Sequence, residues 1–135
     1  MNTVTGFGQP LDTSELFAGE MLATRLSRRG RVVWLAVAGE LDAFTAPKLR
    51  RALREAGVAA GEDLVLDLRG LRFMDSSGLA VVLAAHERAI RDGGEPMRLC
   101  IRGSAPIESM FETIGATDHL NLIEDASELG TPAGA

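Results

Sequence analysis

The chain has 135 residues, of which 46% are apolar, and it carries a formal net charge of −5. This length suits one compact domain with one hydrophobic core, since two domains of half the size would each be marginal. The acidic balance argues against a nucleic-acid partner, because binding to phosphate backbones depends on clustered Lys and Arg. No apolar run approaches the roughly 20 residues of a membrane span, so we expect no direct membrane insertion.

The two ends of the chain differ in composition from its middle. Residues 1–19 and 131–135 are rich in small and turn-forming residues and show little periodicity. This predicts a flexible N-terminal extension and a flexible tail around a folded domain at residues 20–130. At the start of that domain, alternating residues at 21–27 and an apolar run at 32–38 predict two strands joined by a turn.

A helix, a strand and a second helix are predicted next. Thr45 is a suitable N-cap and Gly57 a suitable end for an apolar stripe at helical spacing. Residues 64–68 are too few for a helix of their own and predict a central strand. Apolar residues then recur at helical spacing over residues 79–91, which predicts a helix directly after that strand and its following motif.

The remaining elements are shorter. Alternation predicts a strand over residues 97–102, and Ser104 begins a helix that ends at Gly115. Residues 120–123 predict a last strand and residues 125–129 a short C-terminal helix. Strands that alternate with helices predict an α/β domain with a mixed, mostly parallel sheet of about five strands, an opening antiparallel hairpin and three main helices.

The junction between the central strand and the second helix carries the motif Asp-Ser-Ser-Gly at residues 75–78. Open α/β sheets place ligand and partner sites at such strand-to-helix junctions. Asp75 or Ser76 can cap the helix, and either arrangement leaves the Ser76 hydroxyl near the surface and beside unpaired backbone donors. The positive end of the helix dipole can then accommodate a phosphate on Ser76. On the tetrapeptide alone, a helix cap with no further role is the better explanation.

The wider context of this motif resembles a known family. Gly-Glu-Leu-Asp at residues 39–42, Asp-Ser-Ser-Gly-Leu at residues 75–79, and a Ser-Ala-Pro segment with Met-Phe and Gly at residues 104–115 occur in order. In this order and spacing they resemble the STAS-domain anti-sigma factor antagonists of bacteria. The resemblance spans about residues 20–130 and implies a single STAS-like domain. The longer serine motif is the specific part of it, because Gly-Glu-Leu-Asp alone is a weak signal.

The resemblance implies a partner-switching cycle in the cytoplasm. An anti-sigma factor serine kinase of histidine-kinase-like ATPase fold phosphorylates the serine that follows the motif aspartate, which is Ser76 here. The unphosphorylated antagonist binds that kinase and releases a sigma factor, phosphorylation switches the binding off, and a metal-dependent serine phosphatase resets the cycle. Asp42, Asp75, Ser77 and Gly78 match family positions around the serine, so the resemblance implies that they bind the partner together with Ser76.

We expect no enzymatic activity, and therefore no catalytic residues. A Gly-x-Ser-x-Gly nucleophile elbow fails because residue 74 is Met. His86 is expected on the apolar face of a helix and His119 in a loop, where neither has a partner set for base catalysis. The sequence has no Walker loop and no zinc-ligand pattern, and its single cysteine, Cys100, forms no intramolecular disulfide, so no metal or cofactor is expected.

A second function stays open at this point. STAS domains also occur as adaptor or docking subunits of membrane transport systems and of stress-sensing complexes. The intact serine after Asp75 favours the phosphorylation switch without excluding an adaptor.

Overall fold

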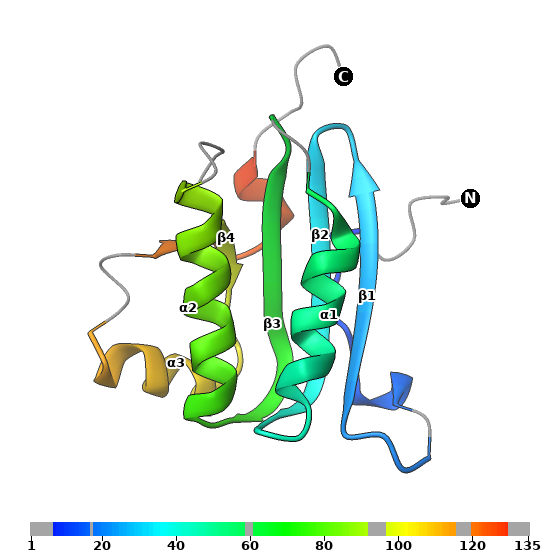
Figure 1. The fold of residues 1–135 in the computed structure, drawn as a ribbon, viewed down its shortest axis with the longest axis vertical. Helices are drawn as coiled ribbons and strands as arrows, with labels where there is room; N and C mark the ends of the chain where they lie inside the picture. The colour runs from blue at the N-terminus through cyan, green and yellow to red at the C-terminus, as the bar shows by residue number, and fades with distance from the viewer. Residues whose placement is uncertain (1–6, 17, 59–60, 92–96, 116–119, 130–135) are drawn as a thin grey trace.

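The computed structural model describes residues 7–16, 18–58, 61–91, 97–115 and 120–129, and Figure 1 shows their arrangement. Among these residues the sheet has five strands in the order β1-β2-β3-β4-β5. The strands are β1 (Leu22–Arg29), β2 (Val32–Leu41), β3 (Asp63–Met74), β4 (Arg98–Cys100) and β5 (Asn121–Leu122). β1 and β2 pair antiparallel, and every later pairing is parallel. The predicted mostly parallel sheet with an opening hairpin is therefore confirmed.

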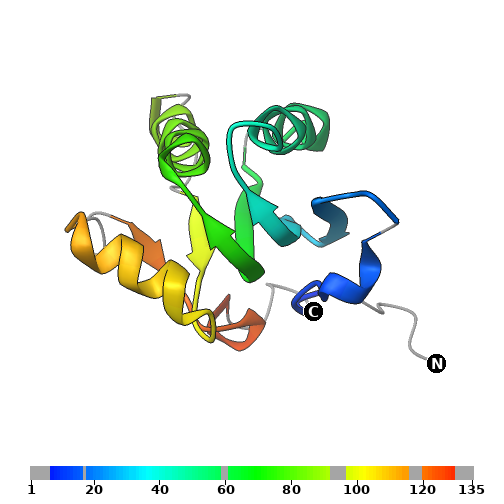
Figure 2. The ribbon, with the colours of Figure 1, turned by 90° about the horizontal axis from the view of Figure 1, so that it is seen from below.

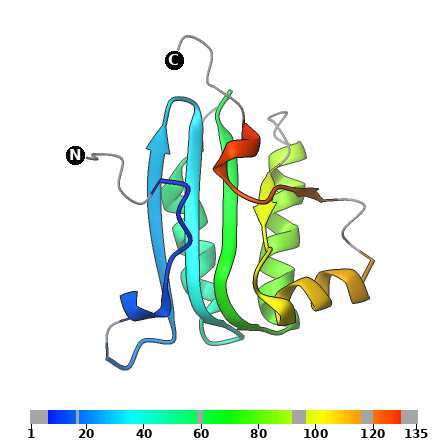
Figure 3. The same cartoon turned by 180° about the vertical axis from the view of Figure 1, so that it is seen from behind.

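Two layers cover the sheet. α1 (Ala46–Ala56) and α2 (Ser76–Arg91) lie over one face, and α3 (Ala105–Thr113) lies beside the β4–β5 edge (Figure 2). Two short 3₁₀ helices, η1 (Thr13–Glu15) and η2 (Ala126–Leu129), lie on the opposite face (Figure 3). The sequence predicted a short C-terminal helix over residues 125–129, and η2 lies there as a 3₁₀ helix. The predicted tail at residues 131–135 and His119 lie outside the described residues.

The side chains of β2 are buried on both faces of the sheet. Val33, Leu35 and Val37 face the core under the helices, and Trp34 and Ala36 face the core on the other side. Strands that are covered on both sides read as continuous apolar runs instead of alternating patterns. This explains why residues 32–38 show no polar face in the sequence.

Residues 7–16 pack against the face of the sheet that the helices leave open. Phe7 and Leu11 are buried there, and the Phe7 ring centroid lies 5.5 Å from that of Trp34. The sequence predicted a flexible extension over residues 1–19, because two apolar side chains among Gly, Thr and Pro give no periodic signal. The described part of that extension forms part of the domain, and residues 1–6 lie outside the described residues.

A buried ion pair links this N-terminal segment to the sheet. The fully buried carboxylate of Asp67 accepts hydrogen bonds from Arg69 Nη2 at 2.7 Å and from Trp34 Nε1 at 3.1 Å. Arg69 Nη2 also donates to the carbonyl of Gly8 at 2.9 Å. The hydrogen bond with Asp67 raises the pKa of Arg69 above its ordinary value, so the guanidinium stays charged. This network satisfies a carboxylate that would otherwise be costly to bury.

Replacing Arg69 should test how much this network stabilises the domain. Arg69→Ala leaves the Asp67 carboxylate buried without its cation, and we expect the free energy of unfolding to fall by about 3 to 5 kcal/mol. Chemical denaturation measures the loss. The matched control is Arg102→Ala, which breaks the exposed ion pair with Glu124 and should cost at most about 1 kcal/mol. A loss no larger than that of the control would contradict the assigned role.

Candidate functional site

The carboxyl ends of two neighbouring parallel strands place the predicted site residues together. Leu41 at the end of β2 pairs with Met74 at the end of β3. One residue later, the Asp75 N–H donates to the Leu41 carbonyl at 3.1 Å. The loop after β2 and the first turn of α2 consequently lie side by side at the lower end of the molecule in Figure 1.

Asp75 caps α2. Its Oδ1 accepts hydrogen bonds from the backbone N–H groups of Ser77 at 2.8 Å and Gly78 at 3.2 Å. Its carbonyl accepts the N–H of Leu79 at 3.0 Å. Of the two capping residues that the sequence allowed, the structure selects Asp75, and α2 begins at Ser76. The Asp75 side chain satisfies first-turn donors that would otherwise be unpaired.

Ser76 is the first residue of α2, and its side chain is exposed. At this position the partial positive charge of the helix N-terminus lies close to the hydroxyl. The side chain can therefore carry an anionic group without entering the core or breaking a hydrogen bond of the helix. Ser77, the next residue, is half-buried.

The Asp42 side chain orders the short loop that precedes α1. Its Oδ1 accepts the N–H groups of Phe44 at 2.9 Å and Thr45 at 3.1 Å. Thr45 occupies the predicted N-cap position of α1, but its side chain makes no capping hydrogen bond to the helix. Its hydroxyl donates instead to the Glu40 carbonyl at 2.8 Å. The Asp42 carboxylate holds the backbone N–H groups of Phe44 and Thr45. Two half-buried aspartates thus order the adjoining loop and helix start.

Gly78 is buried where α2 passes over the end of β2. A Cβ at this position would lie 2.5 Å from Leu41 Cγ, 2.7 Å from Leu41 Cδ2 and 3.0 Å from Met74 Cγ. Gly78 does not have a positive φ. Close packing against Leu41 and Met74, and not an unusual backbone angle, therefore accounts for a glycine at this position.

All five site residues implied by the resemblance gather at this one end of the sheet: Asp42, Asp75, Ser76, Ser77 and Gly78. Their part in binding a partner stays a prediction. The sequence reasoning gave no role to Phe44, which is 94% exposed in the loop between Asp42 and Thr45. The available signal was its position in a short loop after an aspartate, outside any strand or helix pattern that would bury an aromatic ring.

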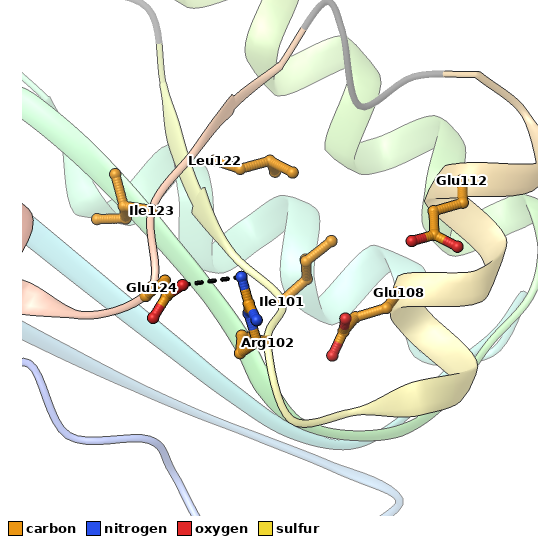
Figure 4. A pocket seen from close by; sticks show the side chains of 7 residues that line it. All are labelled: Ile101, Arg102, Glu108, Glu112, Leu122, Ile123 and Glu124. Carbon is orange, nitrogen blue, oxygen red and sulfur yellow. Dashed lines mark ion pairs between the residues drawn. The ribbon is translucent and has the colours of Figure 1, made fainter.

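A separate hollow of about 400 Å³ lies between β4, α3 and residues 122–124 (Figure 4). Its lining residues are Ile101, Arg102, Glu108, Glu112, Leu122, Ile123 and Glu124. Arg102 and Glu124 form an ion pair at 2.8 Å, and Glu108 Oε2 accepts the Gly103 N–H at 2.8 Å. None of the five predicted site residues lines it. Its charged groups therefore serve local structure, with no connection to Ser76.

Two searches of the described ranges bear on other functions. No helix there combines the length and the apolar composition needed to cross a bilayer. The same residues contain no group of three or more His, Cys, Asp or Glu side chains placed to hold a metal ion.

Comparisons with known proteins agree with the fold. The model of a family described as "Mlab, STAS domain" matches residues 24–124. An anti-sigma-B factor antagonist from Listeria monocytogenes is 35% identical over 86 residues, which cover 64% of this chain and 74% of that protein. The matched stretch of the family model contains all five predicted site residues.

Solved structures give the same result. The crystal structure of an anti-sigma factor antagonist from Mycobacterium paratuberculosis superposes with a TM-score of 0.72 at 25% identity, covering 84% of this chain and 94% of that chain. The Bacillus cell fate determinant SpoIIAA in its phosphorylated form has the same fold, with a TM-score of 0.58 at 22% identity. That likeness covers 79% of this chain and 96% of that chain.

The packing of Gly78 predicts a reversal of the usual glycine rule. Gly→Ala in an open helix position stabilises by about 1 kcal/mol, but Gly78→Ala forces a methyl group into Leu41 and should destabilise by about 1 to 3 kcal/mol. The control Ala84→Gly, on an exposed face of the same helix, should cost about 1 kcal/mol from propensity alone. Thermal and urea unfolding measure both. A stabilised Gly78→Ala protein would refute the packing argument.

Proposed function

The chain belongs to the STAS domain family, and from this premise we propose that it is an anti-sigma factor antagonist that phosphorylation of Ser76 switches off. The observation that carries the proposal is the exposed Ser76 hydroxyl on the first residue of α2, directly after the capping Asp75. A kinase can reach this hydroxyl without unfolding the chain. The similar anti-sigma factor antagonists supply the class of partner.

The charges around Ser76 explain how a phosphate changes binding. A phosphoserine brings about −1.5 to −2 charges at neutral pH. The carboxylates of Asp75 and Asp42 already lie at this end of the sheet, on a chain with a net charge of −5. Within an interface, an unpaired dianion costs several kcal/mol, and about 1.4 kcal/mol corresponds to tenfold in affinity. Phosphorylation then weakens binding by two or more decades.

The fold itself should change little in this switch. The donors of the first turn are held by Asp75, and the helix dipole favours an anion at the N-terminus. The phosphate therefore changes the surface that the partner contacts and leaves the core packing intact.

The partners in this proposal are an anti-sigma factor serine kinase of histidine-kinase-like ATPase fold and a metal-dependent serine phosphatase. The unphosphorylated protein binds the kinase, the kinase releases its sigma factor, and the phosphatase restores the unphosphorylated protein. The proposed location is the cytoplasm, where a sigma factor acts. The acidic surface gives no basis for a direct nucleic-acid contact.

The alternative is an adaptor subunit that docks onto a membrane transport or stress-sensing complex without being phosphorylated. An exposed serine at the helix start favours the switch, because an adaptor has no need of a reachable hydroxyl there. Co-purification with a membrane ATPase, together with a Ser76 that no kinase modifies, would favour the adaptor.

The modification site is tested by mass spectrometry. After incubation with candidate anti-sigma factor kinases and ATP, the chain should gain the mass of one phosphate group on Ser76. Ser76→Ala should gain none, and the control Ser77→Ala should still gain one, because the Ser77 backbone N–H and not its side chain bonds to Asp75. Phosphate uptake by Ser76→Ala would refute the assignment.

A charge substitution tests the repulsion directly. Ser76→Asp should lower the affinity for the same kinase by at least about tenfold and change the free energy of unfolding by no more than about 0.5 kcal/mol. The control is Ser109→Asp on the exposed surface of α3, which adds equal charge away from the site and should bind like the unchanged protein. Equal weakening by both variants would mean that net charge, and not its position, decides binding.

A further inference from the structure

Two phenylalanine rings are exposed at the same end of the sheet as Ser76. The side chain of Phe44 is 94% exposed, and that of Phe73 is 46% exposed. Phe73 lies three residues before Ser76, beside Glu40 of β2. Phe44 lies in the loop that Asp42 orders. Scattered apolar residues occur on most protein surfaces, but large rings gathered around one functional position are typical of an interaction site.

Glu40 separates Phe73 from a second exposed apolar side chain, Met21, which lies directly before β1. The Glu40 N–H donates to the Met21 carbonyl at 2.8 Å, and Glu40 pairs in register with Phe73. The next residue of each strand, Leu22, Leu41 and Met74 respectively, belongs to the core under the helices. Since successive side chains of a strand alternate, Met21 and Phe73 lie on the opposite face. The side chain of Met21 is 44% exposed there.

The Phe44 ring is presented by an ordered loop. Its own N–H and that of Thr45 are both held by Asp42 Oδ1, and the Thr45 hydroxyl is bonded to the Glu40 carbonyl. The Asp42 carbonyl also accepts the N–H of Ala46 at 2.8 Å. A side chain whose backbone is fixed before binding loses less conformational entropy in a complex. Exposure of an aromatic ring on such a loop is therefore suited to binding.

Both rings are carried by segments adjacent to Ser76, within the span of a standard interface. A standard interface buries about 800 Å² on each partner, which corresponds to a disc of about 16 Å radius. Phe73 lies three residues from Ser76, at most about 11 Å along the chain. The loop that carries Phe44 begins beside Asp75, whose N–H bonds to the Leu41 carbonyl at 3.1 Å, and Figure 2 shows this end of the sheet from below. Aromatic side chains near the centre of an interface supply a large share of its binding energy.

The carboxylates of the site have fewer free oxygen lone pairs to offer a partner than exposed carboxylates would. Asp42 and Asp75 are half-buried and already accept backbone hydrogen bonds at Oδ1. Glu40 forms an ion pair with Arg72 at 3.4 Å. These acidic groups are therefore already engaged within the chain, whereas the Phe44 and Phe73 rings are exposed.

We infer that Phe44 and Phe73 are the anchors by which the anti-sigma factor kinase holds this protein, each entering an apolar pocket beside the kinase's catalytic cleft. This inference rests on the proposed function. The two rings supply affinity, and Ser76 supplies the switch. A kinase without apolar pockets at that position would discriminate against this chain, so the two rings also set partner specificity.

The test uses the kinase that phosphorylates Ser76 in the mass-spectrometric experiment and measures its affinity for full-length variants. Phe44→Ala and Phe73→Ala should each weaken binding by about tenfold or more, and should raise the KM for phosphorylation more than they lower kcat. The matched control is Ile90→Ala, whose side chain is 53% exposed near the far end of α2. Ile90 lies about 21 Å along the helix from Ser76, and its substitution should change neither quantity.

The outcomes separate this inference from the function on which it rests. A wild-type chain that no such kinase binds or phosphorylates overturns the proposed function, and the anchors with it. If the wild-type chain is bound and phosphorylated, and the kinase binds Phe44→Ala and Phe73→Ala with the same affinity as Ile90→Ala, only the inference about the two rings is overturned. If Phe73→Ala melts at a lower temperature, Phe44→Ala decides, because a ring that is 94% exposed contributes little to folding.

Discussion

The hydrogen bond from the Asp75 N–H to the Leu41 carbonyl is the contact on which the geometry of the site depends. It extends the parallel pairing of β2 and β3 by one step beyond Met74, so both strands end at the same level. Each strand end is followed by an aspartate, of which Asp75 caps α2 and Asp42 orders the loop before α1. Ser76, these two carboxylates and the segments that carry the exposed rings are neighbours because the two strands end together.

The face of the sheet that α1 and α2 leave open contributes to the stability of the domain. There the Asp67–Arg69 pair, the Trp34 indole and the Gly8 carbonyl form one hydrogen-bonded network beneath residues 7–16. This network satisfies a buried charge in the middle of the domain, whereas the Asp42 and Asp75 carboxylates beside Ser76 are half-buried. The network shares no residue with the proposed site around Ser76. A change of charge at Ser76 can alter the surface without reaching the core.

Most of the fold could be predicted from the sequence, because apolar periodicity and turn residues report directly on burial. The antiparallel hairpin, the central strand and the three helices follow from those patterns. The packing of residues 7–16 could not be predicted, since Phe7 and Leu11 are isolated apolar residues whose burial depends on a sheet formed far along the chain. The sequence left the first turn of α2 open between an Asp75 cap and a Ser76 cap, because Ser76 and Ser77 have no apolar period, and the structure decides for Asp75.

The candidate site, too, could be predicted from the sequence only in part. The motif at residues 75–78 identified the position of Ser76, and the resemblance named the residues that the structure brings together there. The capping role of Asp75 needed coordinates, since either Asp75 or Ser76 could have capped α2, and so did the hydrogen bonds of Asp42 to the loop before α1. The exposure of Phe44 needed them too, because an aromatic residue in a loop is equally compatible with burial.

The central claim is that a phosphate on Ser76 changes partner binding and not the fold. The most direct measurement is calorimetric titration of the kinase, without ATP, with the unmodified chain and with the chain fully phosphorylated on Ser76. The account predicts that the phosphorylated chain binds about a hundredfold or more weakly while both forms unfold at the same temperature. Equal affinities of the two forms would contradict it.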